Sequence, residues 1–147
     1  MKDGPINTKS IEDLLKEFGI TQYKFTDDRI VHFTYHDDLC WLQYDEKPTI
    51  RAGISYSLDD CYDLDIAKRT AMECNNVCIN ATSVVEDDRT FVQGCMTFAN
   101  GTHAISEALP HMLQYLEEAR IYFMRMYQQN VALQLMDLQS KASTLAN

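Results

Sequence analysis

The stretch VHFTYHDDLCWLQYDEKPTIRAGISY, residues 31–56, decides the fold of this chain. It contains three runs in which apolar and polar residues alternate, which is the period of a strand that buries one face. The runs are 31–35, 39–44 and 49–56, and the apolar residues that share a side include Val31, Phe33, Tyr35, Ile50, Ala52, Ile54 and Tyr56. His36-Asp37-Asp38 and Asp45-Glu46-Lys47-Pro48 separate the runs as tight turns. Connections this short predict an antiparallel meander.

The residues before the meander predict a helix over about 9–18. Thr8 or Ser10 is placed to cap it, and Gly19 follows as a natural stop. Its apolar face is formed by Ile11, Leu14, Leu15 and Phe18. A short extended piece, Gln22 to Thr26, then leads to Asp27-Asp28 and the first strand.

The residues after the meander predict a second helix and a hairpin. Carboxylates favour a helix N-terminus because they accept orphan backbone N–H groups, and the cluster that opens this helix is Asp59, Asp60, Asp63 and Asp65. Its stripe of mostly small residues is Leu64, Ala67, Ala71, Cys74 and Cys78. Beyond it, Val77 to Val85 and Thr90 to Phe98 alternate as two strands around the turn at 86–89.

A long helix follows, from Ser106 to about Gln139, with Pro110 expected in its first turn. At about 50 Å it exceeds the width of a compact domain of this size, so the sheet cannot cover its second half. We expect Ser140 to Asn147 to be a fraying tail.

This order predicts an α+β fold in one domain over residues 1–147. An antiparallel sheet of about five strands packs with helices in the order α-β-β-β-α-β-β-α, ending in the long C-terminal helix. The core is expected over about 9–127, and 128–147 forms a helical extension and tail.

Composition excludes several classes of function. The 147 residues include 13 Lys and Arg against 22 Asp and Glu, a net charge of −9, which opposes binding that depends on neutralising phosphates. We therefore expect no nucleic-acid and no membrane partner. The N-terminus lacks the apolar run of a secretory signal, and no stretch is apolar enough for a membrane span. The five cysteines lack paired CxxC spacing, which favours reduced thiols and a cytoplasmic location.

Candidate catalytic and metal-binding residues are few. His32 and His36 share a strand face but stand about 13 Å apart, too far for one metal ion. Cys74 and Cys78 have no second ligand pair nearby, and no acidic turn matches a calcium loop. Cys61, expected at the start of the second helix, is the one candidate nucleophile, but neighbouring aspartates oppose its ionisation. We expect no cofactor and no catalysis.

Three segments carry a resemblance to a known family. They are Ile11-Glu12-Asp13-Leu14-Leu15-Lys16-Glu17-Phe18-Gly19, the strand pair from Ile30 to Tyr44, and the run from Ala71 through Asn75-Asn76-Val77-Cys78-Ile79-Asn80 to Phe98. With the helix that follows, they resemble the YbjN family of bacterial sensory transduction regulators, which shares the fold of type III secretion chaperones. The resemblance covers roughly 9–127. It implies a small cytosolic protein, often dimeric and without catalysis, that binds an extended polypeptide segment or regulates another protein.

The long helix supplies the candidate binding residues. Val131, Leu135 and Leu138 repeat at spacings of four and three, as a seam for another helix does. The expected protein-binding or dimer residues are Tyr122, Met124, Tyr127, Val131, Leu135 and Leu138. We expect a homodimeric, chaperone-like or regulatory binding module. The alternatives are a structural subunit of a larger complex and, with less support, an enzyme whose site has no recognised signature.

Overall fold

The computed structural model describes residues 4–27, 29–45 and 49–146. It confirms the α+β class, with a six-stranded antiparallel sheet in the order β1-β2-β3-β4-β6-β5. The elements are α1 (Thr8–Glu17), β1 (Tyr23–Asp27), β2 (Ile30–Tyr35), β3 (Asp38–Tyr44), β4 (Thr49–Ser57), α2 (Leu64–Val77), β5 (Thr82–Val85), β6 (Thr90–Phe98) and α3 (Thr102–Ala146). The meander is β2-β3-β4. Part of its second turn, 46–48, and Asp28 lie outside the described residues.

The sheet has six strands rather than five, because the extended piece near residue 25 pairs with β2 as strand β1. Tyr23 and Phe25 are half-buried on one side of it, and Lys24 faces solvent. A β-bulge interrupts the pairing between Phe25 and Asp27. A strand of five residues with an irregular end shows too little alternation to be separated from a loop by sequence.

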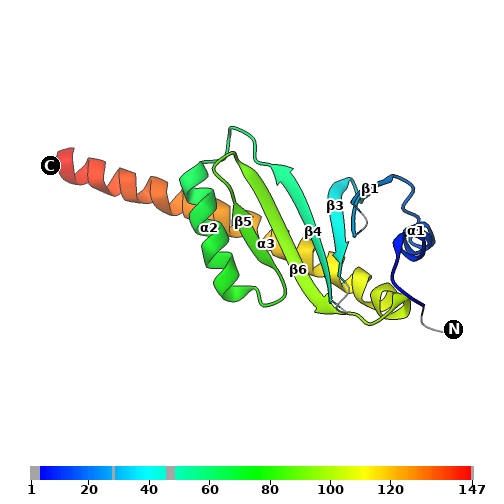
Figure 1. The fold of residues 1–147 in the computed structure, drawn as a ribbon. Coiled ribbons are helices and arrows are strands. Elements are labelled where there is room, and N and C mark those ends of the chain that lie inside the picture. The colour runs from blue at the N-terminus through cyan, green and yellow to red at the C-terminus, as the bar shows by residue number, and fades with distance from the viewer. Residues whose placement is uncertain (1–3, 28, 46–48, 147) are drawn as a thin grey trace.

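The core lies on one face of the sheet, where α1 and α3 pack. The largest buried side chains there include Ile11, Leu15, Val31, Phe33, Leu42, Ile50, Ile105, Leu109 and Leu116. Figure 1 shows α3 running behind β4 and β6 and continuing past α2. The fully buried Gln93 connects β6 to α3: in the amide orientation that satisfies all its neighbours, its nitrogen donates to the Leu116 carbonyl at 2.9 Å and its oxygen accepts from the Arg120 N–H at 3.1 Å.

Both short helices are capped by side chains. The prediction of Thr8 or Ser10 as the first cap is wrong: Asn7 caps α1, and Ser10 completes a reciprocal capping box with it. Gly19, at φ +75°, ends the helix as expected. At α2, Asp63 accepts from the Ile66 N–H at 3.0 Å. Cys61 therefore precedes α2 and does not begin it.

The other element bounds differ from the predicted ones at Val77 and along α3. Val77 is the last residue of α2, so the fifth strand begins at Thr82 and not at Val77. Pro110 lies in the third turn of α3, which already begins at Thr102. Residues 140–146 continue the helix, where we expected a fraying tail. Across the described ranges, no helix combines the length and the apolarity that crossing a membrane requires.

Candidate protein-binding surfaces

The middle of α3 is held by α2. The buried Asn130 side chain donates to the Thr70 hydroxyl at 2.9 Å and to the Glu73 carboxylate at 3.0 Å. Tyr127 accepts a hydrogen bond from the Asp63 N–H at 2.8 Å. α2 thus covers the part of α3 that extends past the sheet, as far as Asn130.

The six expected binding residues therefore lie in different surroundings. Met124 and Tyr127 pack within the chain, where Met124 accepts a hydrogen bond from the Tyr62 hydroxyl. Tyr122 is half-buried and lines a shallow pocket beside residues 78–81. The other three lie on what we call the α3 extension, residues 131–146: Val131 is half-buried, while Leu135 and Leu138 are 55% and 53% exposed.

The apolar seam of the α3 extension is longer than the sequence interpretation held. Ala142 and Leu145 continue the alternating spacing of four and three from Leu138. Both are exposed, and Leu145 belongs to the helix rather than to a tail. The spacing itself could have identified them, but we expected the helix to end before them.

The opposite side of the α3 extension is also apolar in part. Leu133 and Met136 fall on the far side of the helix from the seam, given the 100° turn per residue. Both are exposed. A two-helix seam would leave these side chains in water.

The second face of the sheet carries a further apolar surface. Side chains that alternate away from α3 on β3, β5 and β6 are exposed, and they are Leu39, Val84, Met96 and Phe98. Met96 is 62% and Phe98 72% exposed. Phe98 is the last residue of β6, and the alternation of side chains along the strand assigns it to the same side of the sheet as Met96. Trp41 lies half-buried on the same face.

The outer edge of β5 is covered by one side chain of α2. Asn75 donates through Nδ2 to the Ser83 carbonyl at 2.8 Å and accepts from the Ser83 N–H at 2.7 Å. A primary amide presents the same donor and acceptor as a peptide group, so Asn75 occupies the place of a seventh strand at this residue.

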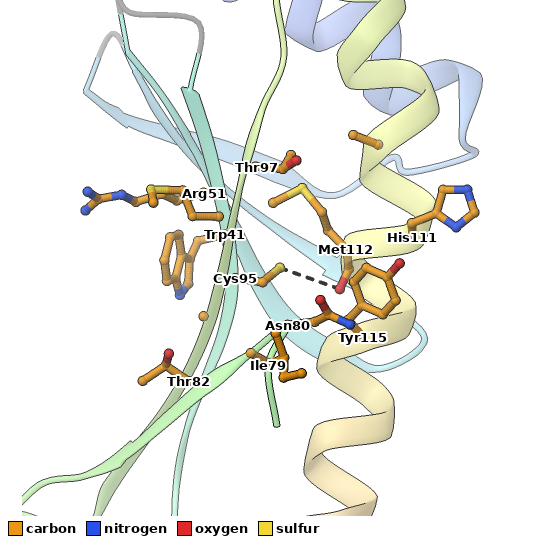
Figure 2. Close-up of a pocket in the computed structure, with 14 residues that line it drawn as sticks. Trp41, Arg51, Ile79, Asn80, Thr82, Cys95, Thr97, His111, Met112 and Tyr115 are labelled. Carbon is orange, nitrogen blue, oxygen red and sulfur yellow. Dashed lines mark hydrogen bonds between the residues drawn. The ribbon is translucent and has the colours of Figure 1, made fainter. Parts of the chain in front are cut away.

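A cleft of about 880 Å³ opens where β5 ends and β6 continues. Figure 2 shows Trp41 and Arg51 on one side of β6 and Met112, His111 and Tyr115 of α3 on the other. The Cys95 thiol reaches the Met112 carbonyl at 3.7 Å across it. Sequence reasoning missed this cleft because it arises from unequal strand lengths.

The cysteines are unpaired and show no activated thiol. Burial raises the pKa of Cys40 to about 12 and that of Cys74 and Cys95 to about 11. Cys61 is exposed, and its hydrogen bond to the Asp59 carboxylate raises its pKa. Within 4–27, 29–45 and 49–146, no three His, Cys, Asp or Glu side chains gather as a metal ion would need.

Comparison with known proteins bears on the fold. No protein-family model matches the chain, and no curated protein matches it. An uncharacterised protein from Methanothermobacter thermautotrophicus is similar in structure, with a TM-score of 0.57 and 11% identity over 82% of this chain and 96% of that one. A chain in the structure of the HopA1-SchA chaperone-effector complex has a TM-score of 0.49 and 7% identity, over 79% of this chain and 98% of that chain. The resemblance to the YbjN family stays a prediction.

Proposed function

We propose that this chain is a non-catalytic, cytoplasmic protein-binding module that works as a homodimer and holds an extended polypeptide in a chaperone-like or regulatory role. The observation that carries the proposal is the amount of apolar side chain left exposed in two places, the α3 extension and the open sheet face. Exposed apolar side chains that share one face are characteristic of interaction sites, and on the sheet face they lie beside the exposed Arg51, the cross-strand partner of Met96. The raised thiol pKa values support a non-catalytic role.

We assign the two surfaces different tasks. The seam Val131, Leu135, Leu138, Ala142 and Leu145 has the spacing of a helix that pairs with another helix. A second copy supplies the matching seam, and between Tyr122 and Leu145 only Asp137 adds negative charge that would repel it. The open sheet face and its cleft remain available in the dimer for a polypeptide partner.

The dimer is tested by paired substitutions on the two sides of the α3 extension. Leu135→Asp with Leu138→Asp places two charges in the seam, and Leu133→Asp with Met136→Asp places the same charges on the far side. Sedimentation equilibrium should give twice 17.0 kDa for the unaltered chain and for the far-side variant, and 17.0 kDa for the seam variant. A seam variant that stays dimeric would move the interface elsewhere.

The binding role is tested with the full chain and reduced insulin B chain, whose aggregation is followed by light scattering. We expect stoichiometric amounts of the protein to suppress aggregation. Phe98→Asp, on the open sheet face, should remove much of this effect, while Ser140→Asp, which carries the same charge on exposed α3, should leave it intact. Equal suppression by both variants would argue against the sheet face as the binding surface.

A second candidate, a subunit of a larger assembly, is favoured by Leu133 and Met136. These two side chains stay exposed once the seam is paired. An assembly larger than a dimer, reduced in mass by Leu133→Asp with Met136→Asp, would support this alternative.

A further inference from the structure

Both edge strands of the sheet have features that prevent another strand from pairing with them, but one stretch of β6 does not. β1 carries a β-bulge and the exposed Lys24, two features that discourage strand pairing. The outer edge of β5 is covered by Asn75. β5, however, begins only at Thr82, opposite Gly94, so residues 95–98 of β6 pair with no strand on that side among the described residues. We call this stretch the β6 edge.

The backbone of the β6 edge presents unused hydrogen-bonding groups. The backbone N–H and carbonyl of Ser83 point away from β6, to Asn75. Ser83 and its cross-strand partner Gln93 are therefore not hydrogen-bonded to each other, and the backbone groups of Gln93 point toward β4. In an antiparallel sheet successive residues point their backbone groups to opposite sides. The N–H and carbonyl groups of Met96 and Phe98 therefore point in the plane of the sheet, toward the side of β6 where β5 is missing. No described residue forms a backbone hydrogen bond with them there.

The cleft beside the β6 edge provides space for side chains on both sides of an added strand. Toward α3, the space is lined by Ala108, Met112 and Tyr115. Toward the open face, it is lined by Trp41, Met96 and Arg51. Alternate residues of a strand placed here point in turn to these two surfaces, because side chains alternate across a strand.

We propose that the β6 edge binds an extended segment of a partner polypeptide as an added antiparallel strand, in line with β5. The segment has apolar residues at alternate positions, which face α3, and a smaller or polar residue opposite Met96 on the open face. This inference rests on the proposed protein-binding function and names the form in which the partner is held.

The backbone pattern identifies an extended peptide as the occupant. Residues 96 and 98 present donor and acceptor pairs about 7 Å apart, a repeat that an extended main chain matches and a compact small molecule does not. A second copy of this chain is a poor occupant, because it would have to offer its own β6 edge. That edge is flanked by β5 and by Ile79, which is 97% exposed and would meet the first copy. Four residues of edge suit one short segment.

The test uses the full chain and the peptide Ac-Lys-Val-Thr-Val-Thr-Val-Lys-NH2. Trp41 is the single tryptophan and lines the cleft, so its fluorescence reports binding. The same peptide with N-methyl groups on its valines keeps the side chains but loses main-chain donors. We expect the first peptide to bind and the N-methylated one to bind roughly tenfold more weakly or not at all.

Two variants locate the binding. Ala108→Arg fills the α3 side of the cleft and should raise the Kd for the peptide by roughly tenfold or more. Gln114→Arg adds the same charge and size at an exposed position of α3 outside the cleft and should change the Kd by less than about twofold.

Equal binding of both peptides, or equal Kd values for both variants, would overturn strand addition at this edge. Strand addition would also be overturned if Ala108→Arg changed the self-association of the protein but left its affinity for the peptide unaltered. Suppression of insulin aggregation that persists in Ala108→Arg would show that the protein-binding function stands while this location for it fails.

Discussion

The indole of Trp41 lies against Gly53, in the space that a Cβ on any other residue would fill. The two residues are cross-strand partners on β3 and β4, and Gly53 in turn pairs with Gly94 on β6. A Cβ at Gly94 would stand 3.9 Å from the indole, an ordinary contact. The missing side chain at residue 53 therefore lets a large ring lie flat on the open face of the sheet.

Gly53→Ala should destabilise the protein by about 1–3 kcal/mol, because the added methyl group overlaps the indole and also lies 2.6 Å from the backbone carbonyl oxygen of Gln93. Urea unfolding followed by Trp41 fluorescence measures this, and the native emission should shift to the red as the ring becomes exposed. Gly94→Ala is the matched control and should be tolerated. A similar decrease in the free energy of unfolding in both variants would mean that the strand backbone, and not contact with the indole, causes the destabilisation.

Asn75→Ala should lower the free energy of unfolding by about 1 kcal/mol, since two hydrogen bonds to the backbone of Ser83 are lost at a site that water reaches. It also uncovers the outer edge of β5, so we expect faster aggregation on warming. Asn76→Ala changes an equally exposed neighbour that makes no described hydrogen bond and should be neutral. Light scattering and urea titration compare the two, and indistinguishable variants would contradict the role of Asn75.

Much of this fold could be predicted because its strands and helices have clear periods. The alternation in 31–56 identified three strands, and the acidic cluster before Leu64 identified α2. What could not be predicted depends on tertiary contacts. Val77 has a strand former's side chain but continues α2, whose buried residues pack against β5 and α3 while Val77 itself stays 59% exposed. Gln93, a polar residue at 0% exposure, is buried because its amide bonds the α3 backbone.

Cys61 should be the first of the five thiols to react with a maleimide in the native protein, because it is exposed while Cys40, Cys74 and Cys95 are buried. It should still react slowly near pH 8, since the hydrogen bond to Asp59 raises its pKa and lowers the thiolate fraction. Asp59→Asn should lower that pKa and speed labelling, with the largest gain below the pKa. Mass spectrometry across a pH series measures the rates.

Asp60→Asn is the control for this series, because Asp60 is exposed but does not bond the thiol. Its labelling rate should stay near that of the unaltered chain. A rapid reaction of Cys61 with loss of the proposed binding would instead support an enzymatic role for this thiol.

The candidate site could be predicted only in part, and α3 shows why. The spacing of Val131, Leu135 and Leu138 identified an exposed seam from sequence alone. Met124 and Tyr127 share the same stripe, yet they pack against Tyr62 and the start of α2. A helical stripe shows which residues face one direction, but not which other element of the same chain already lies there.

Two truncations should separate the docking of α3 from its proposed pairing. A chain ending at Val131 keeps Asn130 and its bonds to Thr70 and Glu73, so its α+β fold should retain nearly full stability. A chain ending at Tyr127 loses those bonds and should be less stable by roughly 1–2 kcal/mol. Both lack the seam beyond Val131, so both should sediment as monomers if the seam is the interface. Sedimentation equilibrium and urea unfolding on the same samples measure the two effects independently. A dimer formed by the chain ending at Val131 would place the interface on α2 or the sheet, while equal stabilities of the two chains would show that Asn130 does not fasten α3.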